Sequence, residues 1–115
     1  MISSVYNNIS ALLAFGTKMG VSANNIANVN TDEFKKSRAD IVETSHGSVD
    51  AEVSRVDTPG SLYSEQGDPA IREMSNVDIA EDVVQTIRTQ NGYQANLKMI
   101  SVHDEMLGSI ISIVK

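Results

Sequence analysis

Two histidines, His46 and His103, are the side chains best suited to acid–base or metal chemistry, and neither lies in a metal-ligand pattern. The chain has no cysteine, which excludes a disulfide framework and a cysteine-based zinc site. His103 is followed directly by Asp104 and Glu105, and consecutive residues of a helix point in different directions. These side chains are therefore poorly placed to share one proton or one metal ion. We expect no catalytic residue, no metal site and no cofactor.

Other common functional motifs are also missing from the sequence. No serine lies in a nucleophile-elbow pattern, and no glycine-rich phosphate loop is present. The formal net charge is -6, which opposes the phosphate contacts that dominate nucleic-acid binding. The apolar stretch before Lys18 has no preceding basic residue and is interrupted by Asn7 and Asn8, so it fits neither a cleaved signal peptide nor a membrane span. We expect no nucleic-acid partner and no direct membrane insertion.

A helix is predicted over about residues 4 to 28. Only 4% of the residues are aromatic and none is Trp, so the core must be aliphatic, which suits helix seams. Apolar and small residues recur at alternating steps of three and four, as in a heptad seam: Ile2, Val5, Ile9, Leu12, Gly16, Met19, Ala23 and Ile26. Gly16 and Gly20 also share a face with Ala23 and Ala27, where small side chains would let another backbone approach closely.

A longer helix is predicted near the C-terminus. Ser75 or Asn76 is expected to cap its start, within a capping-box pattern that includes Val77 and Asp78. Its seam has the same spacing as the first: Ile79, Val83, Thr86, Gln90, Tyr93, Leu97, Ile100, Asp104, Leu107, Ile111 and Val114.

The middle of the chain, residues 35–74, has a different pattern. Val49, Ala51 and Val53 alternate with polar residues, which is the period of a strand. His46 and Gly47 would form the turn of a hairpin with residues 40–42. After a turn at residues 58–60 we expect an irregular stretch.

The predicted fold is mainly α, with long N- and C-terminal helices that pack as a coiled-coil-like pair around a small β or irregular middle segment. We expect residues 1–34 and 75–115 to form one terminal-helix domain and residues 35–74 to form an insert. Both apolar stripes are wider than one partner helix would cover, which favours further helices from neighbouring copies. A free-standing two-helix hairpin is the alternative, although so small a chain has little core to offset its ordering entropy.

Two motifs near the ends of the chain carry a family resemblance. Residues 23–35 read A-N-N-I-A-N-V-N-T-D-E-F-K, close to the pattern A-N-N-I-A-N-x-N-T-x-G-F-K. Residues 75–78, 92–96 and 104–107 are close to S-N-V-D, R-A-Y-E-A-N and D-E-M-L. Over residues 1–36 and 74–114 the sequence resembles bacterial flagellar basal-body rod and hook proteins. Its short middle is most similar to a proximal-rod member of that family.

The resemblance implies a structural subunit of the flagellar basal-body rod, without enzymatic activity. It implies export through the flagellar type III apparatus without a cleaved signal peptide, and polymerisation through the terminal helices in the periplasm-spanning rod. The partners would be further copies of the chain, other rod and hook subunits, and the export apparatus. The motif and seam positions are the expected assembly residues: Ala23, Asn24, Asn25, Ile26, Ala27, Asn28, Asn30, Thr31, Phe34, Ser75, Asn76, Val77, Asp78, Tyr93, Ala95, Asn96, Met106, Leu107 and Ile111.

The sequence departs from the family pattern at a few positions. Glu33 stands where the family usually has Gly, so we expect the turn after the first helix to avoid a positive φ. Asn91 and Gly92 replace Arg and Ala, and Gln94 replaces Glu, which alters the charge on that helix face.

Three other functions are compatible with parts of the pattern. A soluble helical adaptor or chaperone that binds a partner helix would share the seams but would not polymerise. A rod-like paralogue outside the flagellum would share the motifs. A small enzyme has no supporting constellation of residues.

Overall fold

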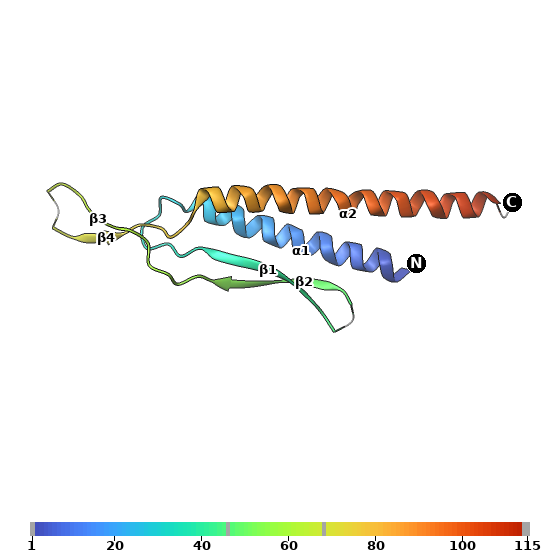
Figure 1. The fold of residues 1–115 in the computed structure, drawn as a ribbon, viewed down its shortest axis with the longest axis horizontal. Helices are drawn as coiled ribbons and strands as arrows, with labels where there is room; N and C mark the ends of the chain where they lie inside the picture. Colours follow the sequence, from blue (N-terminus) through green and yellow to red (C-terminus); the bar gives the residue numbers. More distant parts are fainter. Residues whose placement is uncertain (1, 46, 68, 114–115) are drawn as a thin grey trace.

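The computed structural model describes residues 2–45, 47–67 and 69–113, which form an elongated molecule with extents of 81 × 26 × 13 Å (Figure 1). Two long helices, α1 (Ile2–Ala27) and α2 (Ile79–Ile113), lie at the two ends of this part of the chain. Two small β-hairpins lie between them in the sequence. The predicted mainly α fold, with long terminal helices and a small β middle, is confirmed. Neither helix, over its described residues, is long and apolar enough to cross a membrane.

The two helices lie side by side and antiparallel, as Figure 1 shows. Near the N-terminus, Ser4 Oγ lies 3.2 Å from His103 Nε2. At the other end of the pair, Asn25 Nδ2 donates a hydrogen bond to Asp82 Oδ1 at 3.2 Å. Because Ser4 lies opposite His103 and α1 begins at Ile2, the part of α2 after about residue 105 extends beyond the start of α1.

The first hairpin joins β1 (Ser37–Glu43) to β2 (Val49–Arg55) in antiparallel register, and both strands pack beside α1. Val49 N donates to Ser10 Oγ of α1 at 3.3 Å. The predicted hairpin is confirmed. Its turn is closed by a hydrogen bond from Thr44 N to the Ser48 carbonyl at 2.7 Å, and Gly47 has a φ of 76°. His46, the other predicted turn residue, lies outside the described residues.

The second hairpin pairs β3 (Leu62–Ser64) with β4 (Ile71–Glu73). An irregular stretch was expected here, and that expectation is wrong. Three-residue strands are too short to display a strand period in the sequence. The hairpin is held instead by contacts at its base, where Met74 N donates to the Ser61 carbonyl at 2.9 Å.

Glu33, in the turn after α1, adopts a left-handed backbone conformation with a φ of 59°. The expectation that this turn would avoid a positive φ is therefore wrong. The conformation lets Glu33 N donate to the Glu73 carbonyl at 2.8 Å, which ties the turn to β4. A side chain in this region costs conformational energy that glycine would not.

Very little apolar surface is fully covered within one chain. Among the described residues, Ala14 of α1 and Ala39 of β1 are the only buried hydrophobic ones. The other buried residues are polar or charged: Ser22, Asn25, Asp82, Thr89 and His103. A single copy therefore has a thin, largely polar interior.

Candidate assembly interface

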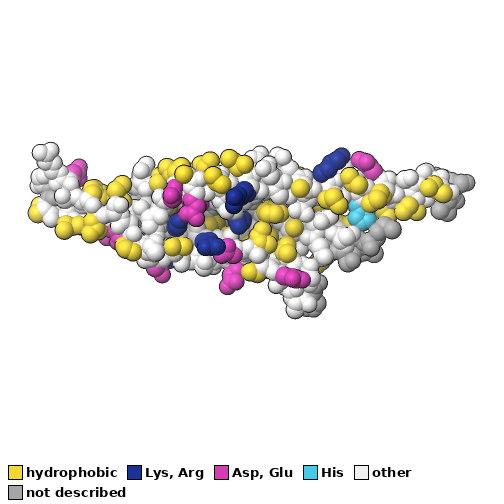
Figure 2. Space-filling model, in the orientation of Figure 1, with side chains coloured by type: hydrophobic (Ala, Val, Ile, Leu, Met, Phe, Trp, Pro, Cys, Tyr) yellow, Lys and Arg dark blue, Asp and Glu magenta, His cyan; other side chains and the backbone are white. Residues whose placement is uncertain are grey.

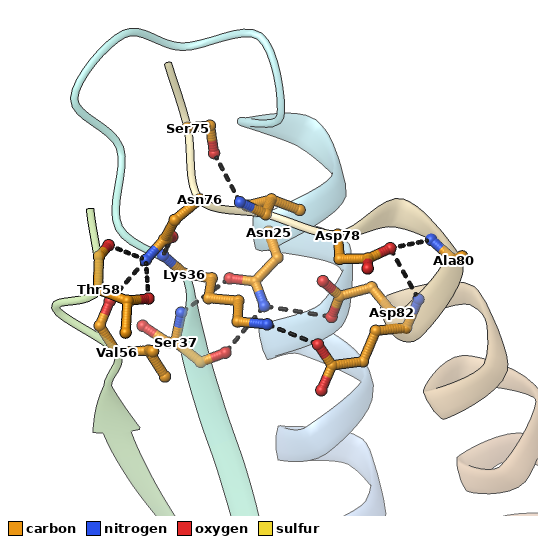
Figure 3. Close-up of polar contacts among 12 residues, drawn as sticks. Asn25, Lys36, Ser37, Val56, Thr58, Ser75, Asn76, Asp78, Ala80 and Asp82 are labelled. Carbon is orange, nitrogen blue, oxygen red and sulfur yellow. Dashed lines mark hydrogen bonds and ion pairs between the residues drawn. The ribbon is translucent and has the colours of Figure 1, made fainter. Parts of the chain in front are cut away.

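Asn25, in the first family motif, joins three elements at the helix junction (Figure 3). Its Nδ2 donates to the Ser37 carbonyl at 2.8 Å and to Asp82 Oδ1 at 3.2 Å, and its Oδ1 accepts from Ser37 N at 2.9 Å. The residue is only 2% exposed. Since a buried amide must have partners, Asn25 fixes the position of α1 relative to both β1 and α2.

Asn76, in the second family motif, plays the corresponding part on the other side of the junction (Figure 3). Its Oδ1 accepts from Lys36 N at 2.6 Å, and its Nδ2 donates to the carbonyls of Val56 and Thr58, each at 2.8 Å. Its backbone N–H donates to the Phe34 carbonyl at 3.3 Å. One side chain thus binds the segments before β1, after β2 and before α2.

Asp78, not Ser75 or Asn76, caps the start of α2. Asp78 Oδ1 accepts from Ala80 N at 2.9 Å and from Glu81 N at 3.3 Å. The predicted cap was wrong because the Asn76 side chain is already hydrogen-bonded at the junction. The helix therefore begins after Asp78, the next side chain that can accept a hydrogen bond. A carboxylate at this position also complements the positive end of the helix dipole.

Lys35, the last residue of the first motif, and Lys36, which follows it, bind carboxylates on either side of the junction. Lys36 Nζ lies 2.5 Å from Glu81 Oε2, and Lys35 forms an ion pair with Glu73. The Lys35 ammonium, together with the Gly60 N–H donated to Glu73 at 2.6 Å, holds the pKa of the Glu73 carboxyl below its usual value. The base of the second hairpin is therefore tied to the segment after α1 by this ion pair as well as by backbone contacts.

Near the same hairpin, the Tyr63 hydroxyl donates to Asp32 at 3.0 Å. This hydrogen bond to a carboxylate raises the pKa of Tyr63, since ionisation of the phenol would lose it and add a second negative charge. Tyr63 and Asp32 also line a pocket with Val29, Asn30, Met74 and Ser75.

The predicted seam of α1 is covered only in part within one chain. The buried residues of α1 are Ala14, Ser22 and Asn25, which lie outside that seam. Of the seam residues, Val5, Leu12, Met19 and Ile26 are partly covered, whereas Ile9, Gly16 and Ala23 are exposed. Ile2, also in that seam, has no described side chain.

On α2 the buried residues are Asp82, Thr89 and His103, while the seam residues Val83 and Leu97 are 42% and 45% exposed. Val114, the last predicted seam residue, lies outside the described residues. Thr86, Tyr93 and Ile100 of the same seam are partly covered, so the described chain covers this seam only in part, and the three buried residues of α2 are polar or charged.

Exposed apolar side chains lie along both helices. They are densest in the C-terminal part of α2, which extends beyond the N-terminal end of α1. On the face shown in Figure 2 they follow α2 toward its C-terminal end, while charged side chains gather near the junction. Met106, Leu107 and Ile111 are 51%, 40% and 63% exposed. The structure therefore separates these three predicted residues from the junction, where Asn25, Phe34, Asn76 and Asp78 come together.

The remaining motif residues divide into exposed and partly covered ones. Asn28 acts locally, since its Nδ2 donates to the Asn24 carbonyl at 2.9 Å and its Oδ1 accepts from Thr31 at 3.2 Å. Asn96 Nδ2 donates to the Gly92 carbonyl at 3.0 Å. The exposed members are Ala23, Asn24, Ala27, Asn30, Thr31 and Ala95, and the partly covered ones are Ile26, Ser75, Val77 and Tyr93.

Several residues that build the junction were not predicted. Asp82 and Thr89 are seven residues apart on one face of α2, but a search for apolar periodicity passes over polar residues. Lys36 and Ser37 follow the first motif directly, and their proximity to it was the only available signal. In the described residues no group of three His, Asp or Glu side chains is arranged to hold a metal ion.

Comparison with known families matches both ends of the chain. A model described as "Flagella basal body rod protein" matches residues 6–35, and one described as "Flagellar basal body rod FlgEFG protein C-terminal" matches residues 71–113. These ranges cover most of α1 and all of α2, and they include Asn25 and Asn76 at the junction. The chain belongs to the flagellar basal-body rod and hook protein family. Proteins of this rod and hook family are structural and are not enzymes.

Three flagellar proteins are similar in sequence to this chain. The flagellar basal-body rod protein FlgG of Bacillus subtilis is 58% identical over 38 residues, 33% of this chain. The flagellar hook protein FlgE of Borreliella burgdorferi is 32% identical over 98 residues, 85% of this chain. The flagellar hook-basal body complex protein FlhP of Bacillus subtilis is 49% identical over 41 residues, 36% of this chain. The matched regions span 14%, 20% and 15% of these relatives.

Proposed function

We propose that this chain is a structural subunit of the flagellar basal-body rod that polymerises through its terminal helices. The observation that supports this most strongly is the exposed apolar surface of both helices in the segments that match the family. Contiguous exposed apolar surface in a protein is typical of an interaction site. The occupants would be further copies of the chain and other rod and hook subunits.

The small-residue face of α1 supports the same proposal. Gly16 and Gly20 are exposed, and a β-carbon added at either would meet no other atom within 4 Å. Ala23 and Ala27 continue this face and are also exposed. A neighbouring helix can approach such a surface closely, and no other described part of the chain lies against the two glycines.

We also propose a domain organisation for the chain. Residues 1–34 and 75–115 would form the terminal-helix domain that packs in the rod, and residues 35–74 would form an insert supported by the junction. In this organisation Asn25 and Asn76 hold the insert to the helices. The brevity of the insert is the basis for placing the subunit in the proximal rod.

We also infer export in an unfolded state through the flagellar type III apparatus, without a cleaved signal peptide, to the periplasm-spanning rod. Supporting this, the described part of the chain has only two fully buried hydrophobic residues, both alanine. The sequence has no disulfide to hold a folded state. A chain with so little internal core should unfold readily for passage through a narrow channel.

The test is to locate the protein in isolated basal bodies. The sequence has no cysteine, so a single Gln66→Cys variant, at an exposed position, can be labelled with maleimide-gold. Deletion of the gene should abolish swimming and rods, and the variant should restore both and carry gold on the rod. Normal basal bodies in the deletion strain, or label confined to the cytosol, would contradict the proposal, and the second result would favour an adaptor.

A further inference from the structure

The second hairpin turns its polar face toward the rest of the chain and its apolar face outward. Directly opposite residues of an antiparallel pair share one face, so Tyr63 and Arg72 lie on one face, and Leu62 and Ile71 lie on the other. Asp32 holds the polar face, since it accepts from the Tyr63 hydroxyl at 3.0 Å and lies 3.9 Å from Arg72 Nη1. Leu62 and Ile71 are 68% and 71% exposed. An antiparallel sheet ordinarily packs its apolar face on the core, so this outward face is typical of an interaction surface.

The side of α2 that faces α1 becomes apolar where α1 stops. His103 is buried in the helix pair and lies 3.2 Å from Ser4 of α1. At 100° per residue, Met106, Leu107 and Ile110 lie within about 60° of His103 around the helix, so they continue the same side of α2. They are 51%, 40% and 47% exposed, since α1 does not extend far enough to cover them. The space in line with α1 is therefore bounded by an apolar helix surface that continues an existing helix contact.

The apolar face of the second hairpin and the end of α2 lie at opposite ends of the long axis (Figure 1). Residues 106–113 contain no charged side chain. On the outward face of the hairpin strands the one charged residue is Glu73, which is paired with Lys35 at the base. The lengths also match, because eight helical residues span about 12 Å and a three-residue strand spans about 10 Å. One chain therefore carries both halves of a contact that are alike in polarity and in size.

We propose that the second hairpin of one copy docks on the C-terminal end of α2 of a second copy, in the space in line with α1. The inference rests on the proposed assembly and adds a specific contact along the long axis. Leu62 and Ile71 of one copy would cover Met106 and Ile110 of the next, which buries apolar surface that each copy alone leaves in water. Because the two surfaces differ, the contact is heterologous and can repeat without closing into a dimer.

The absence of native cysteine allows a direct test. A chain that carries both Ile71→Cys and Ile110→Cys is expressed in the deletion strain, and isolated basal bodies are oxidised with copper phenanthroline. Every copy then has one thiol at each end, so we expect a ladder of disulfide-linked multimers. The matched control carries Arg72→Cys with Ile110→Cys, which moves the first thiol to the opposite face of β4. Its cross-linking should be about 10-fold lower.

The outcomes separate this contact from the proposed function. Basal bodies that contain the double variant but give no ladder would overturn this inference alone. Dimers formed equally well by a chain with Ile71→Cys alone, or with Ile110→Cys alone, would show that like ends meet, which would also overturn it. Absence of the protein from basal bodies would overturn the proposed function as well.

A second test measures coupling between the two ends. Ile71→Lys and Ile110→Asp each place one charge against an apolar surface in every contact, so each should reduce incorporation into rods about 10-fold. In the double variant the opposite charges meet, and incorporation should return to within about threefold of wild type. Gln66→Lys, exposed in the same hairpin but outside its strands, should stay within about twofold. Losses that simply add in the double variant would show that the two positions do not meet.

Discussion

Phe15 of α1 lies directly against Gly92 of α2, so that a β-carbon on Gly92 would be 2.6 Å from Phe15 Cζ. Gly92 stands where the family pattern has alanine, and the aromatic ring occupies the space of the missing methyl group. A glycine inside a helix costs about 1 kcal/mol relative to alanine, and this contact gives the reason for it.

Gly92→Ala should therefore lower the free energy of unfolding by about 1 kcal/mol. Displacing the ring costs roughly 1–3 kcal/mol, which exceeds the gain of about 1 kcal/mol in helix propensity. In a Phe15→Ala background the sign should reverse, because only the propensity gain is left. Urea unfolding followed by far-UV circular dichroism measures both, and the same sign in both backgrounds would contradict the packing explanation.

Asn25→Ala should be the more damaging of two adjacent asparagine substitutions. It removes the amide that bonds Ser37 and Asp82, leaving buried polar groups unsatisfied at a cost of about 2–3 kcal/mol. Asn24 is exposed, so Asn24→Ala should change stability by less than about 0.5 kcal/mol. Equal losses for the two variants, measured by urea unfolding, would show that the junction does not depend on this amide.

Two substitutions of Glu33 should change the stability of the protein in opposite directions. Glu33→Gly should raise stability by about 0.5–1 kcal/mol, because glycine adopts a φ of 59° without a steric penalty. Glu33→Val should lower it by about 1–2 kcal/mol, since a β-branched residue is strained in this region. The melting temperatures of the two variants should fall on either side of wild type, and a common direction would argue against backbone strain.

Acidification should loosen the base of the second hairpin. The pKa of Glu73 is lowered in the folded chain, first by Lys35 and then by the Gly60 N–H. The stabilisation it provides is therefore present above the unfolded value of 4.5 and is lost as pH falls through the lower folded pKa. The Gly60 amide resonance should titrate below pH 4.5 in wild type and not in Glu73→Gln. An identical acid titration in both proteins would exclude Glu73 as the cause.

Regular periods in the sequence were sufficient to predict α1, α2 and the hairpin of β1 and β2. They could not predict the cap at Asp78 or the positive φ at Glu33, because both depend on partners distant in the sequence. The Asn76 side chain is hydrogen-bonded to Lys36 N and to the Val56 carbonyl, and the Glu33 N–H is hydrogen-bonded to the Glu73 carbonyl.

Apolar periodicity could not identify the residues that are buried within one chain. The buried residues of α2 are Asp82, Thr89 and His103, whereas the seam residues Val83, Leu97 and Leu107 are exposed. We assign the exposed part of the stripe to contacts with neighbouring copies.

The proposed assembly requires neighbouring subunits to cover the exposed apolar face of α2, and Leu107 lies within the part that extends beyond α1. Because Leu107 is 40% exposed in the single chain, Leu107→Asp should change the stability of the monomer by only about 0.5 kcal/mol. In a polymer the same carboxylate would be desolvated in every copy, at several kcal/mol each. Ser109→Asp, which places the same charge at an exposed position about 200° around α2 from Leu107, is the matched control.

The decisive measurement is complementation of a deletion strain with each variant, scored by swimming and by electron microscopy of isolated basal bodies. We expect normal rods and swimming with Ser109→Asp, and normal protein levels but no rods with Leu107→Asp. Complete rods and swimming with Leu107→Asp would contradict the claim that this face is buried between subunits.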